Sequence, residues 1–221
     1  MAQDVVTLWN LALSAALAKG QVSSVGEASP EAELCRLWYD LVRQTVLKSA
    51  AWPCAIKHAR LAKLAERTSD DWEIDTVAPG YKYAYAAPSD MLAPRYLAGY
   101  TQFSRSFLNG KVVINTNTPT PILTYTFDQE ATNFWDADLF NAVRAALAAA
   151  IALKLSGKVG ISDRLVQQAN ELIDVARTNE ANEQAVMYER IPRAVMAAGY
   201  DYPSTPTGYV LPYENLSGIL P

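Results

Sequence analysis

The spacing at which hydrophobic residues recur changes twice along this chain of 221 residues, and the change limits the folds open to it. Up to about residue 70, and again over 130–188, apolar side chains return every three or four positions, as on one face of a helix. Over 71–129 apolar and polar residues alternate, as along a half-buried strand. The pattern predicts an α+β fold, mainly α: an antiparallel helical bundle (1–70 and 130–188) with an inserted small antiparallel β-sheet (71–129).

Three helices are expected in the first segment. The first spans about 3–19 and should end at Gly20, where a left-handed residue would fall. The second starts with Ser29 as N-cap and Pro30 as its first residue. The third is a shorter pattern after Pro53, "CAIKHARLAKLAER", with basic residues on its polar side. The apolar stripe predicted for the second helix consists of Leu34, Leu37, Trp38, Leu41, Val42 and Val46.

Three tyrosines at alternate positions, Tyr81, Tyr83 and Tyr85, indicate a strand with one aromatic face. Pro88 has no N–H to donate, so the strand should end there, and a turn should follow at Ser89. Aromatic faces usually lie against a core. We therefore expect these tyrosines to form a packing wall between sheet and helices rather than a ligand site.

Asn109 and Gly110 stand between two strand-like runs, and this dipeptide favours a tight type I′ hairpin turn. Another strand is expected over 121–127, with Leu123 and Tyr125 on one face. The tip of a hairpin projects from its sheet and is open to contacts. Asn109 and Gly110 are therefore candidate contact residues for a partner.

Two more helices are predicted after the strands, over about 133–156 and 162–188. The most apolar stretch of the chain, "FNAVRAALAAAIALKL", is interrupted by Arg144 and Lys154 and is shorter than the roughly 20 residues that cross a bilayer. We expect it to be a packed helix outside any membrane.

The last segment, 189–221, combines prolines with tyrosines at Tyr200, Tyr202, Tyr209 and Tyr213. Prolines at this density prevent regular structure. A solvated linker would be polar and poor in aromatic residues. The composition predicts an extended C-terminal arm that packs against a partner through its tyrosines.

Few residues suggest catalysis or metal binding. The one histidine, His58, lies in the predicted basic helix, which disfavours a Ser-His-Asp or Cys-His arrangement. Cys35 and Cys54 are far apart, which suggests free, buried thiols in a reducing compartment and leaves no zinc ligand set. The acidic run "SDDWEID" lacks the glycine and closing glutamate of a calcium loop and is expected to be a solvated loop. Neither an enzyme activity nor a cofactor is predicted.

The net charge limits the expected binding partners, and the first residues limit the expected location of the protein. A net charge of −4 and a pI near 5.1 argue against a dedicated nucleic-acid binder, which would carry a basic excess. The opening "MAQDVVTLWN" has no basic flank before an apolar run, so no signal peptide is expected. We therefore expect the protein to remain in the compartment in which it is synthesised.

The order of these features resembles that of tail tubular protein A, the head-to-tail adaptor (connector) family of short-tailed bacteriophages, over about residues 5–175. Ala87 departs from the pattern, since a larger apolar residue is more usual before the proline, and nothing after about 185 matches. The matching features are Asn10, the helix start at Ser29–Glu31, the Trp52-Pro53 step, the tyrosine strand that runs into Pro88–Asp90, and the alanine-rich helix after Asp138.

The resemblance implies a structural virion protein, made in the host bacterial cytoplasm and located in the tail or neck. Its copies would form a ring, typically of twelve, between the portal protein and a tail nozzle similar to tail tubular protein B. DNA would pass through the lumen without specific binding, and no membrane is involved. The four tyrosines of the arm would then contact portal and neighbouring subunits, and the tip at Asn109 and Gly110 would face the nozzle.

Two alternatives stay open from the sequence. One is a tail-associated glycosidase that cleaves cell-wall polymer, since two carboxylates are all that this chemistry strictly needs. The other is a connector of a long-tailed phage.

Overall fold

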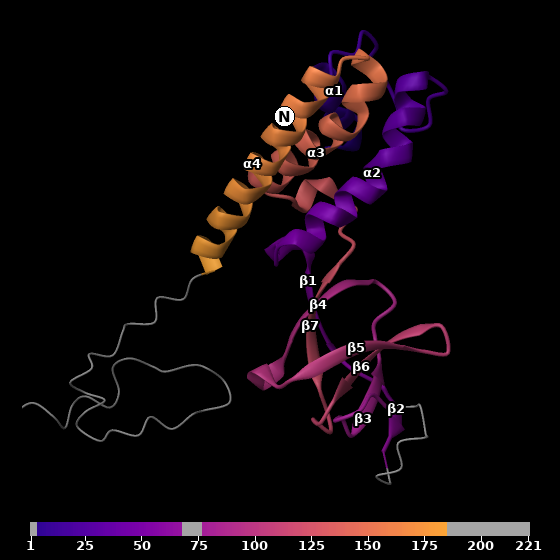
Figure 1. Ribbon diagram of the computed structural model, residues 1–221, viewed down its shortest axis with the longest axis vertical. Coiled ribbons are helices and arrows are strands. Elements are labelled where there is room, and N and C mark those ends of the chain that lie inside the picture. The colour runs from indigo at the N-terminus through magenta and orange to yellow at the C-terminus, as the bar shows by residue number, and fades with distance from the viewer. Residues whose placement is uncertain (1–3, 68–76, 185–221) are drawn as a thin grey trace, which may run out of the picture.

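The computed structural model describes residues 4–67 and 77–184 (Figure 1). Within these residues the chain has an α+β fold of four α-helices and two small antiparallel sheets. Figure 1 shows the helices at one end of the molecule and the strands at the other. The helices are α1 (Val5–Ala15), α2 (Pro30–Ser49), α3 (Ala137–Ser156) and α4 (Val159–Gln184).

The start of α2 is confirmed. The Ser29 hydroxyl accepts a hydrogen bond from the amide of Ala32, and Pro30 occupies the first turn, where a missing N–H costs nothing. Glu31 and Glu33 place negative charge in the same turn, next to the positive end of the helix dipole. These are local interactions, which is why the sequence pattern was sufficient to predict them.

The end of α1 differs from the prediction. The helix stops at Ala15 rather than near Gly20, and Leu17 takes the left-handed conformation with a φ of 61°. The amide of Ala18 then donates back to the carbonyl of Leu13, which closes the helix as a C-terminal glycine motif would. The hydrogen bonds of this closure outweigh the roughly 1–2 kcal/mol that a left-handed conformation costs a non-glycine residue.

Asn10 holds the connection that follows α1. Its side-chain nitrogen donates to the carbonyl of Val22, and its side-chain oxygen accepts from the amide of Val22, both at 2.8 Å. One side chain therefore satisfies both backbone groups of a buried residue. The role of Asn10 in this fold is structural.

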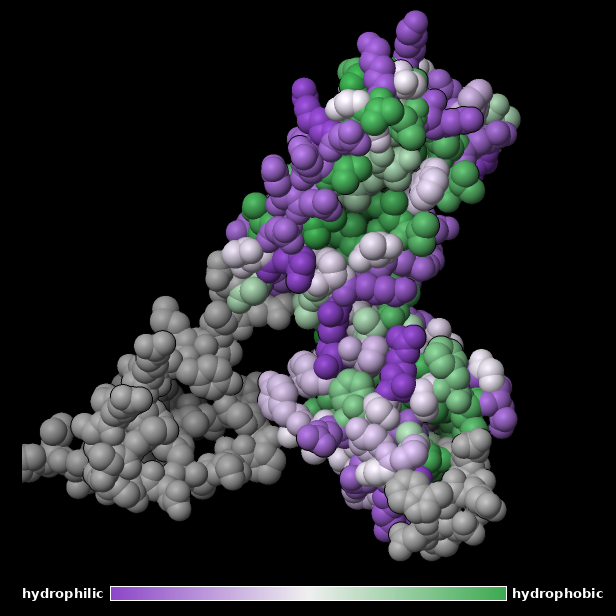
Figure 2. Space-filling model, viewed as in Figure 1, coloured by the Kyte–Doolittle hydropathy of each residue, from purple (hydrophilic) through white to green (hydrophobic). Residues whose placement is uncertain are grey.

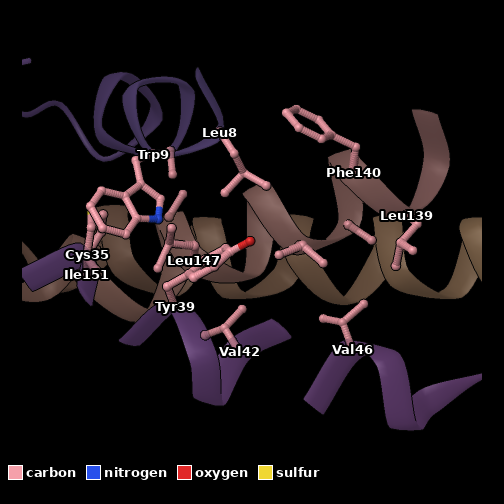
Figure 3. Close-up of a cluster of buried hydrophobic side chains, with 14 of the residues drawn as sticks. Leu8, Trp9, Cys35, Tyr39, Val42, Val46, Leu139, Phe140, Leu147 and Ile151 are labelled. Carbon is pink, nitrogen blue, oxygen red and sulfur yellow. The ribbon is translucent and has the colours of Figure 1, made fainter. Parts of the chain in front are cut away.

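The hydrophobic core of the helical part is built around α3, which contacts α1, α2 and α4. Figure 3 shows Leu8 and Trp9 from α1 meeting side chains of α2 and α3. The Trp9 and Tyr39 rings meet edge to face, with centroids 5.9 Å apart. Among the described residues, α3 is also the one helix long and apolar enough to cross a membrane, yet half of that stretch is buried inside the protein. A core helix accounts for both observations.

The apolar stripe predicted on α2 is only partly correct. Val42 and Val46 are buried, but Leu37 and Leu41 are 71% and 58% exposed. Two apolar faces run along this helix, and the positions of α1 and α3 decide which one is covered. The face that is buried consists of Ala32, Cys35, Tyr39, Val42, Arg43, Val46 and Leu47.

The described strands form two sheets where one was predicted. Their orders are β1-β7-β4 and β2-β3-β6-β5, with every neighbouring pair antiparallel. The strands are β1 (Ile56–Arg60), β2 (Lys63–Glu66), β3 (Tyr83–Ala86), β4 (Met91–Leu97), β5 (Phe103–Leu108), β6 (Lys111–Thr116) and β7 (Ile122–Phe127).

The helix predicted after Pro53 is wrong. A single 3-10 turn, Pro53–Ala55, leads into β1, and β2 follows, so strands begin well before residue 71. The basic residues recur at helical spacing, but β1 pairs with β7, and this distant partner decides the conformation. His58 therefore lies on a strand, with Nδ1 2.8 Å from Oγ1 of Thr124, 66 positions along the chain.

The strand β4 was not predicted. It contains Pro94 and follows the turn that was predicted at Ser89. It is an edge strand that pairs with β7 alone, and its register shifts on both sides of Pro94. A proline is tolerated at a sheet edge because no neighbour requires its missing N–H.

The tyrosine wall lies in a different place from the one predicted. Tyr85 is 2% exposed and packs in a core of the strands, separate from that of the helices. Its hydroxyl lies 2.9 Å and 2.7 Å from the carbonyls of Thr118 and Pro119 and donates to them. Tyr81 lies outside β3. The residues that surround Tyr85 in this core are Leu61, Leu97, Ile114, Leu123 and Tyr125.

Arg43 of α2 joins the helices to the segment after β7. Its guanidinium donates two parallel hydrogen bonds of 2.9 Å to the carboxylate of Asp128, and Gln44 donates a third. Burial works to lower the pKa of Arg43, but the hydrogen bonds and charge of Asp128, with the charge of Asp40, outweigh it and raise the pKa. Bidentate geometry makes this one of the stronger kinds of ion pair.

Arg95 of β4 makes the second connection. Its guanidinium donates to the carbonyls of Leu47, Lys48 and Ala50 at the C-terminal end of α2 and, through Nε at 2.6 Å, to the hydroxyl of Thr126. The last carbonyls of a helix have no partner inside the helix, and a cation there also meets the negative end of the dipole. Burial lowers the pKa of Arg95, but a guanidinium stays charged at neutral pH.

We predict that Arg95→Met lowers the free energy of unfolding by about 2 kcal/mol, because several charge-assisted hydrogen bonds are lost together. Urea denaturation followed by circular dichroism measures the change. Arg105→Met is the matched control, since Arg105 is exposed and lies over the ring of Phe107. Equal stability of the two variants would contradict a connecting role for Arg95.

Candidate interaction surfaces

The described part of the chain offers little for catalysis. No three His, Cys, Asp or Glu side chains in it lie close enough together to hold a metal ion. The predicted solvated loop "SDDWEID" lies outside the described residues. Cys35 and Cys54 are free, and burial raises the pKa of each thiol to about 11, which disfavours the reactive thiolate. Cys35 is buried as predicted, and Cys54 is only partly so.

The carboxylate of Asp90, in the turn between β3 and β4, accepts hydrogen bonds from two side chains. Lys57 donates to it at 2.8 Å and the hydroxyl of Tyr125 at 3.0 Å. The hydrogen bond from Lys57 is the main cause that lowers the pKa of Asp90. An acid that is ionised and paired in this way is a poor proton donor at neutral pH. The arrangement ties the turn after β3 to β1 and β7.

The hairpin turn at Asn109 and Gly110 is confirmed between β5 and β6. Both residues have positive φ, 51° and 74°, as a type I′ turn requires, and both are exposed. Phe107, close to the turn on β5, is 68% exposed, and the guanidinium of Arg105 lies 5.8 Å from its ring centroid. The hairpin therefore presents an apolar ring and a cation beside its tip.

An open pocket of about 350 Å³ lies on the surface of the strands, and sequence reasoning did not find it. Its walls are mostly aromatic, and the Tyr96 and Tyr100 rings stack with centroids 5.2 Å apart. Three separate segments contribute: the residues before β3, the end of β4 and the start of β5. The lining residues are Tyr81, Tyr96, Tyr100, Thr101, Gln102 and Phe103.

The backbone at the pocket is unusual. Gly99 and Tyr100 are both left-handed, with φ of 77° and 51°. A glycine adopts this conformation freely, but a bulky residue does so at a cost of roughly 1–3 kcal/mol. The backbone holds the Tyr100 ring against that of Tyr96, where the side chain of Tyr100 is 78% exposed to solvent. Strain that holds an aromatic ring in solvent is more typical of a binding surface than of a core.

Exposed apolar side chains also occur on the helices, with most of them on α2 and α4. Leu37 and Leu41 are exposed on α2, and Figure 1 shows α4 and α2 on either side of α3. In Figure 2, hydrophobic side chains gather between the polar edges of α4 and α2 on the visible face. A monomer rarely exposes large apolar patches without an interaction to account for them. The exposed apolar residues of α4 are Val159, Val166 and Val175.

The tyrosines predicted to contact portal and neighbours, Tyr200, Tyr202, Tyr209 and Tyr213, lie outside the described residues. Their predicted role therefore stays a prediction. The described chain reaches Gln184, at the end of α4.

Comparison with known proteins does not identify a relative. No protein-family model matches the chain, and a search of curated proteins finds no significant match. Its function is therefore inferred from the surfaces described above. Those surfaces are apolar or aromatic, as the buried centres of protein interfaces often are.

We predict that Asp90→Asn destabilises the protein at pH 7 by roughly 0.5 kcal/mol, as expected for a partly exposed ion pair. The pKa of Asp90 is lower in the folded than in the unfolded chain, so its contribution is complete above about pH 4 and is lost as the pH falls through the folded pKa. The difference in unfolding free energy between Asp90→Asn and the unsubstituted protein, measured by urea denaturation, should therefore be smaller at pH 3 than at pH 7. Lys57→Met should behave similarly, and a gap independent of pH would contradict the prediction.

Proposed function

We propose that the chain is a head-to-tail adaptor of a bacteriophage virion, a ring subunit between the portal protein and the tail nozzle. The observation that carries the proposal is the pair of exposed apolar surfaces on α2 and α4. In this arrangement Leu37 and Leu41 of one copy pack against Val159 and Val166 of the next, which lie two turns apart on the same side of α4.

Head-to-tail contacts between two different surfaces produce a closed ring when the rotation between copies closes. A single patch that bound itself would produce a twofold dimer instead. The helices flank α3 on two sides, so each copy can meet two neighbours at once. This geometry supports a ring over a dimer.

The charge of the chain also supports a DNA channel. A lumen through which a genome moves must not hold phosphate groups tightly, and phosphate contacts come mainly from lysine and arginine. The net charge is −4, with 19 basic and 23 acidic residues. DNA would pass such a surface without a specific site.

Within this proposal the four helices act as an antiparallel bundle and the strands as an inserted region that meets the nozzle. Residues 189–221 act as an extended arm. Tyrosines suit such an arm because they supply a large contact area with few rotatable bonds to immobilise. No cofactor takes part, and the product assembles in the host cytoplasm into the virion neck.

We predict that the purified chain is monomeric or weakly associated and forms a ring when co-expressed with the portal protein of its virion. Ordering an arm has an entropic cost that a partner surface offsets. Light scattering after size exclusion measures the first state, and electron microscopy of the complex shows the second. Particles without a ring in the presence of portal would overturn the proposed function.

The double variant Leu37→Lys with Leu41→Lys should abolish the ring while the thermal transition stays within about 1 °C per substitution, since exposed positions contribute little to folding. Charges placed in an apolar contact would remain unpaired there. Leu64→Lys is the control, because Leu64 is an equally large residue that is 50% exposed on β2. A normal ring from the double variant would exclude this face of α2 from the contact.

At the hairpin tip, Gly110→Val should leave the helices folded but impair attachment of the tail nozzle. A β-branched residue is strained at positive φ, so the tip would change shape. Co-purification with the nozzle protein measures attachment, and co-purification with portal controls for the rest of the molecule. Normal binding of both neighbours would show that the tip has no docking role.

A further inference from the structure

The aromatic pocket on the strands has the chemistry of a site for an extended, proline-containing segment. Tyr81, Tyr96, Tyr100 and Phe103 offer flat apolar rings, and the pocket is open rather than enclosed. Grooves lined by aromatic side chains bind polyproline II segments because a proline ring packs flat against them. Such a segment has no internal hydrogen bonds, so its carbonyls need donors. Gln102 of the pocket can supply one.

This chain carries a segment of that kind beyond α4. The sequence "YDYPSTP" places Pro203 and Pro206 three positions apart, after Tyr202. A polyproline II helix has three residues per turn and rises about 3.1 Å per residue, so in that conformation two prolines three positions apart would share one face, roughly 9 Å apart. Proline has little freedom left to lose on binding, which lowers the entropic cost.

The segment is long enough to reach a neighbouring subunit. Pro203 lies nineteen positions beyond Gln184, where α4 ends. An extended chain of that length spans up to roughly 65 Å. The contact requires that the pocket of the adjacent copy lie within this distance, and tethering to the ring would raise the effective concentration of the segment there.

We propose that the aromatic pocket of one copy binds the Pro203–Pro206 segment of the next copy. The inference rests on the proposed ring and adds to it the contact that links subunits through their arms. It also accounts for the strain at Tyr100, since the left-handed backbone holds an exposed ring that a proline covers.

Site-specific cross-linking in the full chain tests this contact. The photoreactive amino acid p-benzoylphenylalanine replaces Tyr100, or Tyr96 in a second variant, and unlabelled and ¹⁵N-labelled copies are mixed before assembly and irradiation. Mass spectrometry should find the pocket joined to the peptide that contains Pro203 and Pro206, in light–heavy pairs that prove linkage between copies. The same photoreactive group at Phe134, which is 63% exposed and outside the pocket, is the control and should not capture that peptide.

A competition experiment defines the role of the prolines. An excess of a synthetic peptide of residues 200–213 should abolish the cross-link, whereas the peptide with alanine at 203 and 206 should not. Capture of a different peptide, of the copy's own arm alone, or equal competition by the alanine peptide overturns the inference. A ring without the cross-link overturns it while the proposed function stands. A cross-link between copies that do not form a ring would support this contact but overturn the proposed adaptor function.

Discussion

The fold depends on how two arginines hold the helices to the strands. The two parts have separate hydrophobic cores, and Leu92 of β4 packs against the core of the helices, so the arginine contacts act together with this apolar contact. Arg43 reaches from α2 to Asp128, just after β7, and Arg95 reaches from β4 to the last carbonyls of α2. Each guanidinium binds several acceptors at once, and guanidinium geometry suits this task because it offers several fixed donors.

The packing of the helices and the connection between β4 and β5 determine which apolar surfaces stay exposed. Because α3 takes the central place among the helices, α2 can bury only one of its two apolar faces, and Leu37 and Leu41 are left outside. On the strands, the connection from β4 to β5 turns through Gly99 and Tyr100 and leaves an aromatic pocket open. Contiguous exposed apolar patches often mark sites of interaction. The adaptor proposal assigns the first surface to the ring and the hairpin tip to the nozzle.

The candidate sites differ in how far the sequence could predict them. The hairpin tip was predictable, since Asn109 and Gly110 both favour positive φ and the runs beside them alternate. The aromatic pocket was not predictable, because its residues come from β4 and from the segments before and after it. Pro94 within β4 makes this segment look unlike a strand in the sequence. No local pattern places Tyr81 beside Tyr100. The exposed face of α2 was also missed, since its leucines have the same helical spacing as core residues.

The sequence by itself determined what depends on neighbours within a few residues. Ser29 caps α2, Asp136 caps α3 by accepting from the amide of Leu139, and glycine at position 110 sets a tight turn. Only the tertiary structure decided that 56–66 forms strands, that Leu37 faces outward and that Arg95 binds the last carbonyls of α2. The physical reason is distance along the chain. A cap or a turn is a hydrogen bond over three or four residues, whereas β1 becomes a strand through pairing with β7, some 66 positions away, and no local preference encodes that partner.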